Sequence, residues 1–329
     1  MPGKTSRVAI AGGAAPGVGR TIADALVENG YEVVILTRRS TVDSTSASTS
    51  MISAGFKKQQ DHYTVRPINY DDISDILSVL DADRIDTLIS TIPSGLPIIT
   101  HLNLLEAAKR SSTVKRYIPS NWGAGDAVNS KVDRFRSKHE ALKMLRDANN
   151  ADGLEFTCLL PGQYFMNYLA QGSPKNLHGE AMSGLYDFSI PVDMNGRTAE
   201  VGGSGDEPLV FTRLEDLAQG VVEVLAEEKW EYDATWVVGD VVCWNEVIRL
   251  AERILNTKFS VTYLPLKDLE ARAAGMTPGS KEQMLVQLQA CSARGELRPS
   301  PTHGTDKVKV IRSRGAKRVE EFLEEWWGA

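Results

Sequence analysis

The sequence predicts an α/β fold built on a doubly wound parallel sheet, and three observations support this prediction. Short runs of β-branched and small apolar residues recur along the first half of the chain. Between these runs lie segments whose apolar residues recur at the spacing of an amphipathic helix. A cluster of glycines separates the first apolar run from the first helical segment. Alternating strands and helices of this kind are typical of βαβ units in a parallel sheet.

The elements follow one another in a regular order. Residues 7–12 (RVAIAG) are typical of a buried strand, residues 20–29 of a helix that ends at Gly30, and residues 31–37 of a second strand. We predict four further strands at 64–68, 87–92, 116–119 and 155–160, with helices at 73–80, 101–111 and 136–149 between them. Because right-handed crossovers place the carboxyl ends of parallel strands at one edge of the sheet, we expect the ligand there.

The second half of the chain is less regular. Residues 39–53 are rich in Ser and Thr, and residues 171–208 are rich in Gly, Pro and Ser, so we predict long loops in both places. Later helices are expected at 214–226, 244–256, 282–294 and 317–327, with a strand at 235–238.

Composition argues against several classes of protein. The 329 residues are 42% hydrophobic and 24% charged, as is usual for a soluble globular chain, and the net charge of −6 disfavours nucleic-acid binding. The three Cys lie far apart and the five His show no ligand spacing, so we expect neither a disulfide framework nor a metal site. No apolar run reaches about 18 residues and no signal-peptide pattern occurs, so we expect a cytoplasmic protein with no membrane partner.

The glycine cluster has the spacing of a dinucleotide-binding turn. From Gly13 through Gly17 to Gly19 it follows G-x-x-x-G-x-G, directly between the first strand and the first helix. Glycines let the backbone approach a pyrophosphate, and the N–H groups at the start of the following helix can bind its charge. Val18, between the last two glycines, is a further candidate contact. The alternative is a tight turn without a ligand, but the position between strand and helix favours dinucleotide binding.

The end of the second strand indicates which dinucleotide is bound. An NAD-binding chain usually has an acidic residue there for the ribose hydroxyls, whereas this chain has Arg38, Arg39 and Ser40. Guanidinium groups suit a 2′-phosphate because they form bidentate, charge-assisted hydrogen bonds. We therefore predict NADP(H) as the cofactor, with Arg38 as the principal contact. The alternative is a pair of surface arginines at a strand exit.

Several segments together resemble the NmrA-like and isoflavone reductase-like family of atypical short-chain dehydrogenases/reductases. They share residue types and order with that family over nearly the whole chain. The segments are 114–123 (VKRYIPSNWG), 135–138 (FRSK), 153–157 (GLEFT), 214–218 (LEDLA) and 244–246 (WNE). The chain departs from the family in an extra residue and Pro16 in the glycine turn, and in Asn121-Trp122, where plant members have Glu-Phe.

The resemblance implies a two-lobed unit. Residues 1–165 would form a Rossmann-type NADP-binding domain to which residues 209–242 return. Residues 166–208 and 243–329 would form a smaller C-terminal α/β substrate-binding lobe. A substrate cleft would then lie between the two, over the nicotinamide. Sequence leaves open whether the chain is a monomer or a homodimer.

The resemblance also implies a catalytic role for Lys138. In the more typical short-chain dehydrogenases a Y-x-x-x-K motif would place a Tyr at position 134, but this chain has Arg134. Lys138 would lie beside the nicotinamide ribose and protonate or stabilise a developing oxyanion. The alternative is a surface lysine on a charged helix.

Other site residues are expected where the strands end. Tyr164 is a candidate proton donor, and the candidate substrate walls are Trp122, Tyr164, Phe165 and Tyr168. The remaining candidate cofactor contacts are Thr91, Ile92, Pro93, Ser120, Asn121, Pro161 and Gly162. Ordinary core packing is the alternative for the aromatic residues.

Taken with the resemblance, these residues predict an NADPH-dependent reductase of a small aromatic, phenolic or enone-type metabolite, in secondary metabolism. Two alternatives stay open on the sequence. One is a non-catalytic NAD(P)-binding regulator or redox sensor of the NmrA-like kind, and the other is a cofactor-dependent isomerase.

Overall fold

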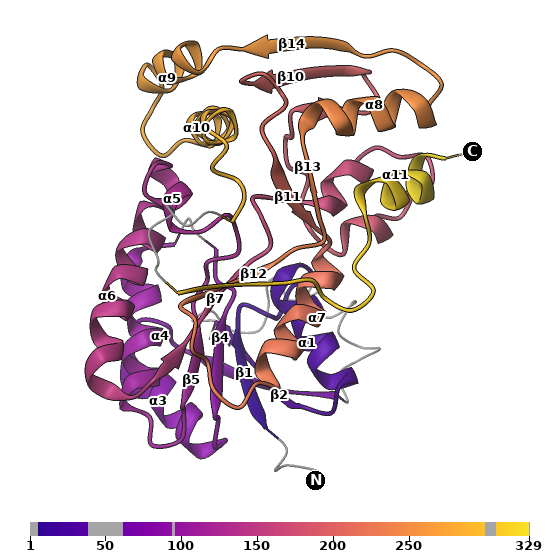
Figure 1. Cartoon of the computed structure of the whole chain (residues 1–329). Coiled ribbons are helices and arrows are strands. Elements are labelled where there is room, and N and C mark those ends of the chain that lie inside the picture. The colour runs from indigo at the N-terminus through magenta and orange to yellow at the C-terminus, as the bar shows by residue number, and fades with distance from the viewer. Residues whose placement is uncertain (1–5, 39–61, 94–95, 300–306, 329) are drawn as a thin grey trace, which may run out of the picture.

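Six parallel strands form the central sheet of the computed structural model, which describes residues 6–38, 62–93, 96–299 and 307–328 (Figure 1). The strand order is β3-β2-β1-β4-β5-β6. The chain first adds β2 and β3 on one side of β1 and then adds β4, β5 and β6 on its other side. This topology confirms the predicted Rossmann-type, doubly wound α/β class. The strands are β1 (Arg7–Ala11), β2 (Glu32–Arg38), β3 (Tyr63–Ile68), β4 (Thr87–Ser90), β5 (Arg116–Ile118) and β6 (Glu155–Phe156).

Helices cover both faces of this sheet. α3, α4 and α6 pack together on one face, and α1 packs against α7 on the other (Figure 1). Successive strand residues point to opposite faces, so Val8 and Ile10 of β1 pack in one apolar cluster while Ala9 and Ala11 pack in another. The helices are α1 (Val18–Glu28), α3 (Ile73–Ala82), α4 (Ile98–Arg110), α6 (Arg136–Asp152) and α7 (Leu214–Leu225).

The predicted strand at 155–160 is divided in two. β6 pairs with β5, whereas β7 (Cys158–Leu160) pairs with β12 (Ala234–Val237), which in turn pairs with β15 (Val308–Ile311). The chain changes partner at Thr157, whose hydroxyl lies 3.4 Å from that of Thr235. The pairing of β12 with β7 places the segment after α7 beside the central sheet. The domain division proposed from the sequence stays a prediction.

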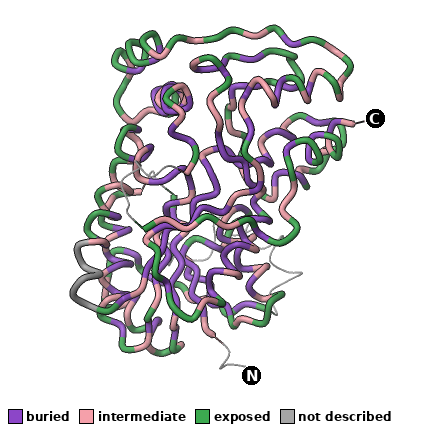
Figure 2. The backbone as a smooth tube through the Cα atoms, in the orientation of Figure 1, coloured by how far each residue is buried: buried purple, intermediate pink, exposed green. Residues whose placement is uncertain are grey.

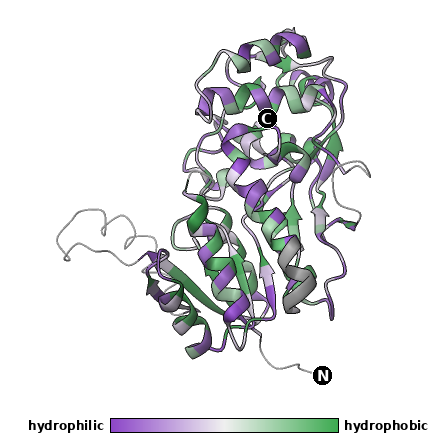
Figure 3. Ribbon diagram, turned by 90° about the vertical axis from the view of Figure 1, so that its left-hand side faces the viewer, coloured by the Kyte–Doolittle hydropathy of each residue, from purple (hydrophilic) through white to green (hydrophobic). Residues whose placement is uncertain are grey.

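The remaining elements lie above the carboxyl edge of the sheet, as the two perpendicular views show (Figures 1 and 3). One small sheet has the order β13-β11-β8 and the other has the order β14-β10-β9. Their strands are β8 (Tyr164–Phe165), β9 (Val192–Asp193), β10 (Thr198–Gly202), β11 (Leu209–Thr212), β13 (Asp240–Val242) and β14 (Ser260–Leu264). The helices of this region are α8 (Trp244–Ile254), α9 (Leu266–Ala274), α10 (Lys281–Ala293) and α11 (Val319–Trp327). Short helices complete the chain at α5 (Asp126–Asn129), η2 (Asp133–Phe135), η3 (Met166–Ala170) and η4 (Glu180–Met182).

Burial follows this layered arrangement. The central strands are buried along most of their length, while the outer turns of the helices and β14 are largely exposed (Figure 2). None of the helices within the described ranges has the length and apolarity needed to cross a membrane.

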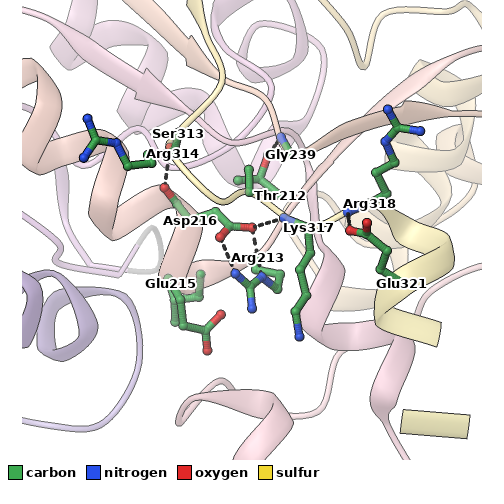
Figure 4. A network of polar contacts seen from close by, with 12 residues as sticks. Thr212, Arg213, Glu215, Asp216, Gly239, Ser313, Arg314, Lys317, Arg318 and Glu321 are labelled. Atoms are coloured by element: carbon green, nitrogen blue, oxygen red, sulfur yellow. Dashed lines mark hydrogen bonds and ion pairs between the residues drawn. The ribbon is translucent and has the colours of Figure 1, made fainter. Parts of the chain in front are cut away.

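A buried polar network joins the C-terminal segment to the start of α7 (Figure 4). Asp216 accepts a hydrogen bond at 2.9 Å from Arg213 Nε and another from the backbone N–H of Lys317, and its own carbonyl accepts from Ser313. Only 5% of the Asp216 side chain is exposed. The LEDLA segment therefore has a structural role, because its aspartate ties residues 313–317 to the start of α7.

Candidate functional site

The glycine turn lies between β1 and α1 in a conformation that requires glycine. Gly17, which caps α1, has φ of 121°, a value that L side chains rarely adopt. A Cβ on Gly19 would come within 2.8 Å of Gly13 Cα, so the first turn of the helix can lie this close only with glycine there. Among the described residues no side chain caps α1, so its first N–H groups, from Val18 onward, are available to an anion.

A strap from the C-terminal half lies on this turn. We define the strap as residues 181–185. A Cβ on Gly184 would come within 2.7 Å of the Gly17 nitrogen, which shows how closely the strap packs against the turn. Asn167 holds the strap in place, because its amide nitrogen donates to a strap carbonyl at 2.7 Å while its amide oxygen accepts from Leu214 N at 2.8 Å. The predicted loop region therefore packs directly against the glycine turn.

Arg38 ends β2 and is exposed, as expected for a residue that could bind a 2′-phosphate. Its positive charge acts on the buried Tyr70, whose hydroxyl donates to Leu36 O at 2.9 Å. Burial raises the pKa of the Tyr70 hydroxyl, while a hydrogen bond from the Gly12 backbone and the charge of Arg38 lower it. The sequence analysis did not identify Tyr70 as a neighbour of Arg38. The sequence shows only that an aromatic residue follows shortly after the end of β3. Arg39 and Ser40 lie outside the described residues.

Hydrogen bonds join the ends of β4 and β5. Ser120 Oγ donates to Ile92 O at 2.7 Å, and Trp122 Nε1 donates to Ser90 O at 3.0 Å. Thr91 Oγ1 donates to the carbonyl of the last residue of β1 at 2.8 Å. The structure thus gathers these candidates at the carboxyl edge of three adjacent strands. The group also includes Pro93 and Asn121, which follow the same strand ends.

Lys138 lies in the first turn of α6 and lines a small cavity at the end of β5. Its Nζ lies 5.9 Å from the centroid of the Phe135 ring, and within the described part of the chain it forms no ion pair. Burial lowers the pKa of Lys138 to about 8. Ser120 and Asn121 line the same cavity, so the amine lies at the same edge of the sheet as the other candidates. Lys138 is half-buried, and its catalytic role stays a prediction.

A family model described as the NmrA-like family matches residues 4–323. This chain belongs to the NmrA-like family. The finding confirms the family resemblance over nearly the whole chain.

Individual relatives and solved structures agree with this membership. Oxidoreductase BOA1 of Botryotinia fuckeliana is 32% identical over 257 residues, which span 77% of this chain and 77% of the relative. Phenylcoumaran benzylic ether reductase PT1 of Pinus taeda is 25% identical over 81% of this chain and 80% of the relative. The fold is similar to that of the leucoanthocyanidin reductase–NADPH complex from Vitis vinifera, with a TM-score of 0.72, 18% identity and coverage of 98% and 99% of the two chains.

The aromatic candidates of this NmrA-like chain fall into two groups. Tyr164 and Phe165 are adjacent in β8, so their side chains point to opposite sides. The Tyr164 ring meets Trp244 edge to face with centroids 5.3 Å apart, and burial raises the pKa of its hydroxyl. Phe165 instead packs in an apolar cluster with Trp122 and Tyr168.

The structure therefore does not bring Tyr164 and Lys138 into one cavity. Tyr164 lines a separate cavity between β10 and α10, together with Glu200, Arg272 and Gln289. Alternation along a strand is readable from sequence, and it could have separated Tyr164 from Phe165 before the structure was known.

The last two candidate cofactor contacts lie in a turn after β7. Gly162 has φ of 90°, and a Cβ there would collide with the carbonyl oxygen of Val210, so this turn after Pro161 requires glycine for a structural reason. Among the described residues no group of three or more His, Cys, Asp or Glu could hold a metal ion.

Proposed function

We propose that this NmrA-like protein is an NADPH-dependent reductase that transfers a hydride to a small aromatic, phenolic or enone-type metabolite in secondary metabolism. The observation that carries the proposal is the amine of Lys138, which is unpaired within the described chain and has a lowered pKa at the edge of the sheet where the dinucleotide turn lies. The curated relatives named above, an oxidoreductase and a benzylic ether reductase, support the reaction class. The NADPH complex of a structural neighbour supports the cofactor.

The chain offers groups for both phosphate-bearing parts of the cofactor. Gly13, Gly17, Gly19 and the first N–H groups of α1 would hold the pyrophosphate. Arg38 would hold the 2′-phosphate, in agreement with the sequence prediction for NADP(H). When bound, NADPH supplies the hydride.

The chain's own groups would then handle charge and water. Hydride addition to an enone or a carbonyl leaves negative charge on oxygen, and an ammonium at Lys138 would stabilise that charge and donate a proton to it. The apolar cluster that includes Trp122, Phe165 and Tyr168 would exclude water from the reacting centre. Tyr164 is left without a proton-transfer role in this scheme, because it lines a separate cavity.

A two-step experiment tests the proposal. First, NADPH is titrated by its fluorescence against the unmodified protein, Arg38→Ala and the matched control Arg249→Ala, an exposed arginine far along the chain on α8. We expect Arg38→Ala alone to weaken NADPH binding, by roughly tenfold to a hundredfold, the usual loss for a charge-assisted hydrogen bond. Equal affinity of all three proteins would overturn the assignment of Arg38.

Second, NADPH oxidation is followed with menadione, an aryl enone and a benzylic ether as probe substrates. Turnover that Lys138→Ala lowers by about a hundredfold or more supports the reductase, because general acid catalysis contributes on that order. Tight NADPH binding with no turnover of any probe, and conversion of a probe without net NADPH oxidation, would point to the regulator and the isomerase respectively. Either result would replace the proposal.

A further inference from the structure

The cavity beside Lys138 contains a second titratable side chain that the reductase scheme does not use. His101 of α4 and Lys138 of α6 both line this cavity, together with Tyr117 of β5 and with Ser120 and Asn121, which follow that strand. The cavity is large enough for a water molecule. It is separate from the cavity that Tyr164 lines.

His101 is buried and one of its ring nitrogens lacks a partner. The residue is 5% exposed, and within the described chain Nε2 has no hydrogen-bond partner. Buried polar atoms in native proteins are almost always hydrogen-bonded, to protein or to ordered water. An unpartnered ring nitrogen on a water-sized cavity therefore indicates a bound water.

The charge state of His101 fits this arrangement. Burial, together with the nearby charge of Lys138, lowers the pKa of His101 to about 4, so the imidazole is neutral near pH 7. A neutral ring adds a hydrogen bond to the cavity without repelling the ammonium of Lys138. Tyr117 from β5 is the other titratable group on this cavity, and burial raises the pKa of its hydroxyl, so it is also neutral.

We propose that His101 is a positioning residue for Lys138: His101 Nε2 holds a water molecule in this cavity, and that water accepts a hydrogen bond from Lys138 Nζ. The water supports the ammonium form and aims the amine toward the carboxyl edge of the sheet. The inference rests on the proposed function for its catalytic meaning. It involves no change in covalent bonding, and the proton that Lys138 gives up in turnover is replaced from solvent.

Competitive labelling with acetic anhydride across pH 6–11 measures the pKa of the Lys138 amine without any substrate or cofactor. Mass spectrometry of the Lys138 peptide reports its neutral fraction in the unmodified protein, His101→Leu and His101→Gln. A water bonded to the ammonium favours the charged form, so its loss in His101→Leu lowers the pKa, by about one unit, which is tenfold more neutral amine near pH 7. His101→Gln keeps a polar atom for the water and should leave the pKa close to that of the unmodified protein.

The matched control is His139→Gln, which alters the histidine next to Lys138 in sequence. Its Nδ1 lies 2.5 Å from Asp126 Oδ1, so its ring has a different partner. An unchanged Lys138 pKa in folded His101→Leu would overturn the proposal, as would equal shifts in His101→Leu and His139→Gln. If His101→Leu does not fold, a high-resolution crystal structure of the unmodified protein decides, because a cavity without water between His101 and Lys138 contradicts the proposal. Labelling measures the pKa of the Lys138 amine and not turnover. A failure of this proposal can therefore be told apart from a failure of the proposed reductase function.

Discussion

Replacing Gly184 with alanine tests whether the strap closes the dinucleotide turn. Gly184 has φ of 78°, and its Cβ would come within 2.7 Å of the Gly17 nitrogen and still closer to the Pro16 ring. The substitution therefore combines two effects: a left-handed backbone that disfavours alanine, and a collision between the strap and the turn.

Gly179 separates these effects. It lies two residues before the strap and has φ of 77°, but a Cβ there would meet no heavy atom within 4 Å. Gly179→Ala should therefore cost about 1 kcal/mol of unfolding free energy, the penalty for a left-handed non-glycine residue. Gly184→Ala should cost about 2–4 kcal/mol, because the collision adds a further 1–3 kcal/mol of overpacking.

Urea unfolding measures the two free energies, and NADPH fluorescence measures the affinity. Since the strap leaves its place over Pro16 and Gly17 only in Gly184→Ala, we expect about a tenfold rise in the NADPH dissociation constant for that variant alone. Equal losses of stability and of affinity in the two variants would refute the close contact between strap and turn. A larger loss in Gly179→Ala would contradict it as well.

Two further predictions concern charged groups. Burial lowers the pKa of Lys138 to about 8, so the ammonium dominates at pH 7 and the amine at pH 9; kcat/KM for a probe substrate should fall as pH rises through about 8. Lys138→Arg, which stays charged, should lose that limb, and a fall that persists in this variant would contradict the assignment. Asp216→Ala should cost about 3–5 kcal/mol in urea unfolding, because it leaves the largely buried Arg213 without its carboxylate. Glu320→Ala, from the exposed pair with Arg253, should cost under about 1 kcal/mol, and equal costs would show that the Figure 4 network adds no stability.

The pattern of apolar residues along the sequence predicted the strands that are buried along nearly their whole length and the helices that bury one face. β1 and β2 follow from short apolar runs, and both are mostly buried in the structure. α1 follows from the glycine turn and the helical spacing of apolar residues, and it buries one face. β14 and β15 were missed because their residues are mostly half-buried or exposed, so their existence depends on pairing with β10 and β12. No alternation in the sequence signals such pairing.

The same distinction holds for the candidate site. Gly17 and Arg38 are candidates because their spacing along the chain has a chemical reason, whereas Lys138 is a candidate because of the family resemblance. The structure describes all three, and their roles stay predictions. His101 and Gly184 were missed, since what distinguishes them is a neighbour distant in sequence. A lone histidine in a helix and a glycine in a long loop show no pattern until the fold brings them to Lys138 and to Gly17.

Contacts from α10 and from the turn before it hold the residues that precede the Lys138 helix. Asp133 N donates to Gln287 Oε1 at 3.0 Å, Gln287 Nε2 donates to Asp133 Oδ2 at 2.9 Å, and Arg134 donates to Gly279 O at 3.0 Å. Position 134, which would be Tyr in a Y-x-x-x-K chain, therefore serves to anchor the helix.

Gln287→Ala removes two of these bonds, so we expect it to cost about 1–3 kcal/mol. If α10 positions Lys138, the variant also lowers kcat for a probe substrate while NADPH affinity stays unchanged, because the glycine turn lies on β1 and α1. The matched control is Asn245→Ala on α8, which likewise loses side-chain hydrogen bonds, to Asp206 at 2.7 Å and from Tyr263 at 2.8 Å, but lies outside this contact. A loss of stability with unchanged kcat in Gln287→Ala would show that the contact only holds the two parts of the chain together. A selective loss of kcat would show that α10 positions the amine of Lys138.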